Sequence, residues 1–183
     1  MLVGSRLTLR PFRSSDVSAN YLRWLNDPAV NRYLEVGTQH QTTATAREYL
    51  KRFQRSNTDR MFAIIHRTSG QSIGTVTINR VHRIHKTAET GLMIGRKECW
   101  RQGYALEAWR LVLDYAFTVL GVRKMIAGAV AENHASIATL EKLGFEHEGR
   151  FRREFVVDGV CHDVVRLGLQ REEWAKARGR IAS

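Results

Sequence analysis

Residues 90–115 read TGLMIGRKECWRQGYALEAWRLVLDY and change character twice. The segment starts with the alternation of a strand, continues through a loop with Arg96, Lys97 and Arg101, and becomes an amphipathic helix at Gly103. The first turn of a helix leaves backbone N–H groups unpaired and carries partial positive charge, which favours a phosphate group. Gly103 lets the backbone approach a ligand closely. The segment therefore predicts a strand–loop–helix unit that binds a phosphate-bearing ligand.

Two common phosphate motifs are absent from this segment. The chain has no G-x-x-x-x-G-K-[ST] sequence, and Gly95 and Gly103 do not form G-x-G-x-x-G. A glycine between a strand and a helix is common in α/β proteins, so the turn alone also fits a purely structural role. The choice between these interpretations requires further motifs.

Residues 100–105, WRQGYA, resemble the loop that binds the pyrophosphate of acetyl-CoA in the GNAT acetyltransferase superfamily. That loop usually reads [RQ]-x-x-G-x-[GA]; Trp100 replaces the Arg or Gln, as is common in the Rim-type branch of ribosomal-protein N-terminal acetyltransferases. Further segments resemble that branch in the same order: HKTAE at 85–89, ENHAS at 132–136, EKLGF at 141–145, and EGR at 148–150 followed by Asp158-Gly159. The resemblance spans about residues 7–174.

The resemblance implies a mixed α/β fold with a mostly antiparallel, seven-stranded sheet flanked by helices. The sheet is expected to splay between its fourth and fifth strands, which contain Glu89 and Val122, so that the pantetheine arm of acetyl-CoA lies in the split. We expect one domain over residues 1–183, with a core at about 7–174. The residue pattern itself predicts strands at 7–11, 61–66, 72–80, 87–94, 122–130, 145–157 and 160–169, and helices at 14–26, 28–34, 46–55, 103–120, 136–143 and 171–180.

Acetyl-CoA is the expected co-substrate, and no metal is expected. The amides of the loop would bind the pyrophosphate, and unpaired amides at the edge of the fourth strand would hold the pantetheine arm and polarise the thioester carbonyl. The resemblance adds an asparagine that contacts the arm. The candidate cofactor-binding residues are Leu92, Met93, Ile94, Trp100, Arg101, Gln102, Gly103, Tyr104, Ala105 and Asn133.

Glu89 is the first candidate for the general base. Strand alternation places Glu89, Gly91 and Met93 on one face, and a buried carboxylate is costly unless it is paired or used. A structural ion pair with an arginine explains the residue equally well. Glu154 is the second candidate, although a shift of one residue would turn it to the opposite face.

Ser136 is the candidate acid for the departing thiolate. Many GNAT enzymes use a tyrosine for this step, but Leu140 occupies that position here. The Rim-type resemblance points instead to the serine four residues earlier. The acceptor amine is expected beside the early helices, where the candidate contacts are Asn31, Arg32, Tyr33 and Glu35. A capping and packing role for these four residues remains equally open.

The expected activity is acetyl transfer to a primary amine, with a protein N-terminal α-amine as the leading acceptor. An amino sugar or a polyamine is the alternative, although a polyamine suits a chain of net charge +11 poorly. A basic RNA- or ribosome-binding module with a non-catalytic fold is an alternative of another class. We expect a cytoplasmic protein with reduced cysteines, and count the ribosome and a second copy of the chain among its candidate partners.

Overall fold

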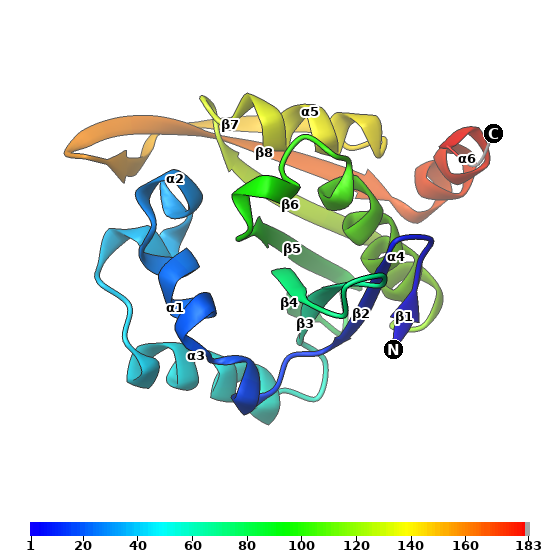
Figure 1. Ribbon diagram of the computed structural model, residues 1–183. Helices are drawn as coiled ribbons and strands as arrows, with labels where there is room; N and C mark the ends of the chain where they lie inside the picture. The colour runs from blue at the N-terminus through cyan, green and yellow to red at the C-terminus, as the bar shows by residue number, and fades with distance from the viewer. Residues whose placement is uncertain (182–183) are drawn as a thin grey trace.

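The computed structural model describes the backbone of residues 1–181 and the side chains of residues 1–178. These residues form one eight-stranded sheet with helices on both faces (Figure 1). The strands are β1 Leu2–Val3, β2 Leu7–Pro11, β3 Arg60–His66, β4 Ser72–His82, β5 Thr87–Ile94, β6 Lys124–Val130, β7 Glu146–Val157 and β8 Val160–Gln170. The helices are α1 Ala19–Asn26, α2 Pro28–Asn31, α3 Thr43–Arg55, α4 Tyr104–Thr118, α5 His134–Lys142 and α6 Arg171–Ile181, with short 3₁₀ helices at Ser14–Asp16, Glu35–Thr38 and Lys97–Cys99.

The strand order is β1-β2-β3-β4-β5-β6-β8-β7, and β5 and β6 are the parallel neighbours among the described strands. Their pairing runs from Thr87 opposite Lys124 to Glu89 opposite Ile126 and then stops. The remainder of β5 diverges from β6, so the predicted splay is confirmed. The predicted number of strands is wrong by one, because β1 has two residues and is too short to show an alternating pattern.

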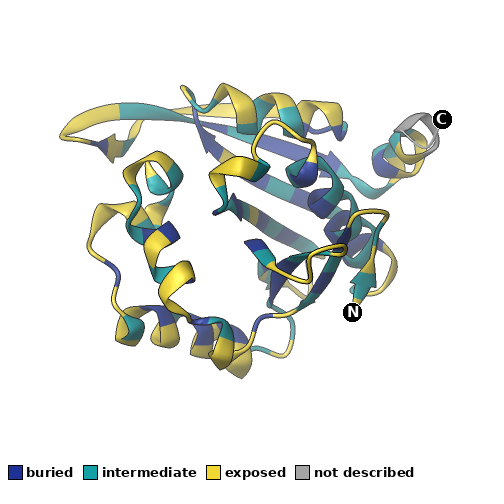
Figure 2. Cartoon of the chain, viewed as in Figure 1, coloured by how far each residue is buried: buried dark blue, intermediate teal, exposed yellow. Residues whose placement is uncertain are grey.

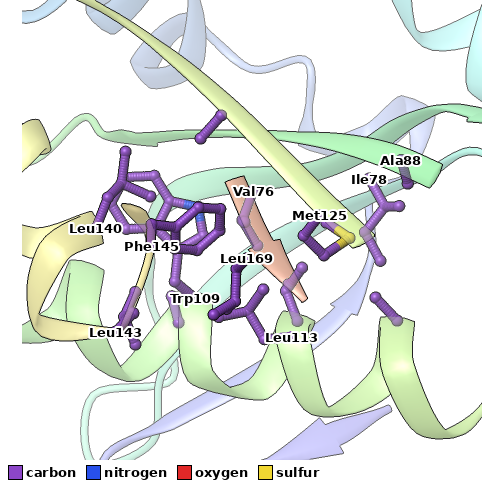
Figure 3. Packing of buried hydrophobic residues seen from close by; sticks show 14 of the residues in the cluster. Val76, Ile78, Ala88, Trp109, Leu113, Met125, Leu140, Leu143, Phe145 and Leu169 are labelled. Carbon is purple, nitrogen blue, oxygen red and sulfur yellow. The ribbon is translucent and has the colours of Figure 1, made fainter. Parts of the chain in front are cut away.

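Each face of the sheet has its own hydrophobic core. Phe62 and Ile64 of β3 point to the side covered by α4 and α5, whereas Met61 and Ala63 point to the side covered by α1 and α3. Figure 3 shows the first core, in which Trp109 and other α4 side chains pack on the sheet. Burial in Figure 2 follows this layering, with exposed residues on the outer helix faces and the β7–β8 hairpin. No helix among residues 1–181 has the length and apolar character needed to span a membrane.

Two predicted helix starts are wrong by about one turn. Ser18, not the Ser14–Asp16 segment, caps α1 by accepting a hydrogen bond from the Tyr21 N–H. Asp16 instead forms an ion pair with Arg10 at 2.7 Å. Thr42 caps α3 in a box with Thr45, so the helix starts at Thr43 and not at the predicted residue 46. In both places a neighbouring hydroxyl was equally able to cap, and the tertiary contacts decided which one does.

The closing hairpin contains a feature that the sequence pattern did not predict. Its turn is as expected, since Asp158 and Gly159 both have positive φ, 50° and 78°. However, the pairing of β7 with β8 shifts between Phe151 and Phe155, which oppose Val164 and His162. Residues 152–154 therefore form a bulge in β7.

Candidate active site

Two helices begin at the open end of the split. β5 leads through a loop into α4, and β6 leads into α5. Because β5 and β6 are parallel, both helix N-termini lie at the end where the strands diverge. Glu89 lies at the closed end, five residues or about 17 Å of strand from Ile94. The split therefore has a mouth bordered by two helix N-termini and a closed end that carries a carboxylate.

The predicted phosphate loop presents a row of backbone donors at this mouth. The first backbone hydrogen bond of α4 runs from Glu107 N–H to Gly103 O at 3.1 Å. The N–H groups of residues 101–106 have no acceptor within the described part of the chain. Arg101 and Gly103 have positive φ, 59° and 78°, and this turn opens the helix. An anion at the mouth would satisfy these donors.

Three cationic side chains lie near the loop, and they differ in whether they are already paired with a carboxylate. Arg96 pairs with Glu98 at 3.2 Å and also donates to the Ser72 carbonyl. Lys97 pairs with Asp27 at 2.7 Å. Arg101 is exposed and forms no ion pair with any residue that the structure describes. Arg101 is therefore the loop cation left to neutralise a phosphate.

Trp100 and Tyr104 hold the loop in place with their side chains. The Trp100 indole donates to the Ile94 carbonyl at 2.8 Å and ties the loop to the end of β5. The Tyr104 hydroxyl lies 3.1 Å from His66 Nε2, and the Arg6 guanidinium lies 4.5 Å from the centre of the Tyr104 ring. These two residues can therefore contribute backbone groups to a ligand while their rings support the loop.

Glu107 anchors the first turn of α4 to the start of the chain. Its carboxylate accepts hydrogen bonds from the N–H groups of Arg6 and Leu7 at 2.8 and 3.0 Å, and from the Arg6 guanidinium at 2.9 Å. Burial alone would raise the pKa of Glu107, but these hydrogen bonds outweigh it and hold the pKa below its ordinary value.

Glu107→Gln is expected to lower the free energy of unfolding by about 1.5 kcal/mol at neutral pH, since bonds to a charged acceptor are lost. A depressed pKa stabilises the fold above the pKa of the unfolded chain, and this stabilisation disappears as pH falls through the folded pKa. Urea unfolding from neutral to acidic pH should show the two proteins converging at low pH. Glu48→Gln, which removes a solvent-exposed pair with Lys51, should change the free energy of unfolding much less. A pH-independent difference for Glu107→Gln would contradict this account.

Glu89 is held by two arginines at the closed end of the split. Its carboxylate lies 3.2 Å from Arg80 Nη1 and 3.7 Å from Arg166 Nη2, and its side chain is 24% exposed. It shares a sheet face with Met93, as predicted, on the side of α1 and α3. The ion-pair interpretation is thus realised in the structure, and Glu89 is the last residue of β5 that pairs with β6 before the split begins.

Arg166 reaches Glu89 from β8 across β6. Its ladder partner on β6 is Gly128, which has no side chain to obstruct the guanidinium; a Cβ there would lie 3.6 Å from Arg166 Nη1. The guanidinium also lies 5.6 Å from the centre of the Phe151 ring on β7. Neither Arg80 nor Arg166 was predicted as a site residue, because this contact joins strands far apart in sequence.

Ser136 and Asn133 lie at the start of α5. Asn133 is the N-cap, and its side-chain oxygen accepts a hydrogen bond from the Ser136 N–H at 3.3 Å. Ser136 is half-buried in the first helical turn, and Leu140, one turn further, is 1% exposed in the core. The two polar residues therefore belong to the mouth of the split rather than to its closed end.

Glu154 lies in the β7 bulge and is exposed. Asp163 of β8 supports the bulge by accepting from the Arg153 N–H at 2.8 Å and pairing with Arg150 at 2.6 Å. Residues in a bulge do not alternate strictly between the two faces of a sheet. The sheet face to which Glu154 belongs therefore could not be predicted by counting residues back from the Asp158-Gly159 turn. The structure shows no contact that brings Glu154 to Glu89 among the described residues.

An open groove of about 770 Å³ separates the early helices from the β7–β8 hairpin. Asn31 and Arg32 line it, whereas the other two predicted acceptor contacts, Tyr33 and Glu35, do not. Asn31 also donates to the Leu25 carbonyl at 2.7 Å, so it has a structural role as well. Figure 1 shows the hairpin extending over α2. The opposite wall of the groove comes from residues 155–159, which sequence reasoning did not include.

Helix α1 connects the groove to the phosphate loop. Trp24 packs so closely on Gly95 that an added Cβ at this glycine would lie 2.1 Å from the indole. The Lys97–Asp27 ion pair joins the same two elements. The wall of the groove and the loop at the mouth of the split are thus parts of one packed unit.

Comparisons with known proteins agree with this geometry. A family model described as the acetyltransferase (GNAT) domain matches residues 6–146. An uncharacterised N-acetyltransferase, p20 of Bacillus licheniformis, is 30% identical over 95% of this chain and 98% of its own. Spermidine N(1)-acetyltransferase of Escherichia coli K12 is 28% identical over 91% of this chain and 87% of its own.

A solved structure shares the fold. It is a chimera of the spermidine N-acetyltransferase SpeG of Vibrio cholerae with hSSAT, and it superposes with a TM-score of 0.83 at 24% identity. The match covers 93% of this chain and 99% of that one. The sheet with its split, the helix N-terminus at the mouth and the family match lead to one conclusion. The chain belongs to the GNAT family and is an acetyl-CoA-dependent N-acetyltransferase.

Proposed function

We propose that the acceptor is the α-amine at the N-terminus of a polypeptide, and that acetyl moves to it directly from acetyl-CoA. The residues that line the groove support this choice of acceptor. Among its described lining residues Asp158 is the acidic side chain, while Arg32 and His40 are basic or titratable. A polyamine carries several positive charges and needs carboxylates around it, whereas a peptide presents one amine followed by polar backbone. The Rim-type motifs of the sequence support the same acceptor.

Acetyl transfer to an α-amine requires only weak general-base catalysis from the protein. An α-amine has a pKa of about 7.7–8, so a sizeable fraction is neutral near neutral pH and a weak base suffices. We assign this base to Glu89, directly or through a water, with Glu154 as the second candidate. As the amine attacks the thioester carbon, its proton passes to the carboxylate. The N–H groups of Leu92 and Ile94, which alternation turns toward the diverging edge of β5, stabilise the oxyanion, whereas the N–H group of Met93 faces β4.

The thiolate leaves toward α5 in this proposal. We assign Ser136 as its proton donor or as the holder of a water, and Asn133 as a contact of the CoA arm. The amides of residues 101–105 and Arg101 hold the pyrophosphate. Trp100 and Tyr104 keep this loop in shape, and Asn31 and Arg32 contact the acceptor. Support for these roles comes from their positions along the split and the groove.

The relative rates of candidate acceptors test the proposal. Release of CoA should be measured with short peptides bearing a free N-terminus, the same peptides blocked at the N-terminus, spermidine and an amino sugar. We expect free peptides to exceed spermidine in kcat/KM by at least tenfold, which corresponds to about 1.4 kcal/mol of transition-state discrimination. Equal rates with blocked and free peptides, or a preference for spermidine, would refute the acceptor assignment and leave acetyl transfer itself intact.

A further inference from the structure

A second concentration of positive charge lies at the end of the sheet opposite to the phosphate loop. The turn between β4 and β5 contains no acidic residue from 80 to 86 and packs beside the start of β6. The Arg123 N–H donates to the Lys86 carbonyl at 2.7 Å, and Arg123 Nε donates to the His85 carbonyl at 3.0 Å. We call this surface the basic end and define it as Arg80, Arg83, Lys86, Arg123 and Lys124.

The charges of the basic end are only partly neutralised. Arg80 pairs with Glu89, and Lys124 pairs with Glu148. Arg83, Lys86 and Arg123 are exposed and form no ion pair with any residue in the described part of the chain. A third carboxylate, that of Asp59, lies at the same turn and accepts from the Val81 N–H at 3.2 Å. The five cations, which come from β4, the turn and the start of β6, therefore still outnumber the carboxylates around them. Such a surface attracts a polyanion at low ionic strength.

Apolar and flat groups accompany these cations. Ile84 at the tip of the turn is 84% exposed, and the rings of His82 and His85 stack with their centres 4.3 Å apart. The turn is also fixed in shape, because the His85 N–H donates to His82 Nδ1 at 3.0 Å. Unpaired nucleobases stack on flat rings and contact apolar side chains, whereas an acidic peptide needs only the charges.

We propose that the basic end binds single-stranded RNA through its phosphates, with the imidazole pair and Ile84 contacting bases. The proposal does not depend on which amine accepts the acetyl group. Arg80 links this surface to the closed end of the split, since it also holds Glu89. RNA bound there would lie next to the transfer site without occupying the groove or the phosphate loop.

The dependence of RNA affinity on salt tests the proposal. Binding of a labelled single-stranded RNA of about 20 nucleotides, longer than a typical site on a small domain, should be followed by fluorescence anisotropy over a range of KCl concentrations. Each phosphate contact contributes about 0.7 to the slope of log K against log salt for single strands. Arg83→Gln/Lys86→Gln/Arg123→Gln should therefore reduce the slope by about 2. Acetyl transfer to the preferred amine should be unchanged.

A matched control variant tests whether RNA binding depends on the cations of the basic end or only on the net charge of the whole protein. Arg47→Gln/Arg55→Gln/Lys176→Gln removes three exposed cations from α3 and α6 and should leave the slope nearly unchanged. If the first variant does not fold, Arg83→Gln/Lys86→Gln alone should reduce the slope by about 1.4. Equal losses in both triple variants would overturn the proposal. The proposal would also be overturned if the protein bound polyglutamate but not the single-stranded RNA.

Discussion

Gly103→Val is expected to raise the Kd for acetyl-CoA by at least tenfold. Gly103 has a φ of 78°, and an L-residue in this region costs about 1–2 kcal/mol, with a β-branched residue at the upper end. The added side chain also stands beside the N–H groups that would bind the pyrophosphate, where the nearest atom, Arg6 Nη2, is 3.4 Å from the Cβ position. Because 1.4 kcal/mol equals a factor of ten in Kd, titration calorimetry should resolve the change.

The other end of the same helix provides the control. Gly121 follows α4 with a φ of 67°, and a Cβ there would meet no atom within 4 Å. Gly121→Val therefore introduces similar backbone strain far from the mouth of the split. We expect it to lower stability and to leave the affinity for acetyl-CoA unchanged. Normal affinity in Gly103→Val would rule out the loop as the pyrophosphate site.

Glu89→Gln is expected to reduce kcat by roughly a factor of ten near pH 7, and by more at lower pH, while the affinity for acetyl-CoA changes little. The amide cannot accept the proton of the attacking amine, so turnover then depends on the fraction of acceptor that is already neutral. That fraction falls with decreasing pH, and the deficit should be largest at low pH. Steady-state rates measured across a pH series, with binding measured separately, would show this pattern.

Two outcomes distinguish a base from an ion-pair partner. If Glu89 serves only to hold Arg80 and Arg166, its replacement should lower the melting temperature while the pH profile keeps its shape. Glu154→Gln is the matched control, because Glu154 is exposed in the β7 bulge. We expect it to change kcat less than Glu89→Gln. The reverse order of effects would transfer the role of base to Glu154.

Local sequence was sufficient for several parts of the site. The strand at Thr87–Ile94 has the predicted bounds, and the face shared by Glu89 and Met93 follows from alternation alone. The helix behind Gly103 and the hairpin whose strands meet at Asp158-Gly159 were also predicted correctly. These features depend on periodicity and on glycine, and both act over a few neighbouring residues.

Other parts of the site depend on partners distant in the chain. Glu107 binds the backbone of Arg6 and Leu7, which lie about a hundred residues earlier in the chain. Asp163 fixes the bulge that carries Glu154, and the groove wall opposite Asn31 comes from a hairpin more than a hundred residues later. No periodicity relates these residues to one another.

The strand at residues 87–94, the helix that follows Gly103 and the face of Glu89 on its strand could be predicted from the residues around them. Each of these follows from steric and hydrogen-bonding preferences within one or two turns of chain. The ion pairs of Glu89 with Arg80 and Arg166, the packing of Trp24 on Gly95 and the lining of the groove could not be predicted in this way. Those contacts form only when separate strands and helices pack together, because packing rather than sequence distance sets which side chains meet.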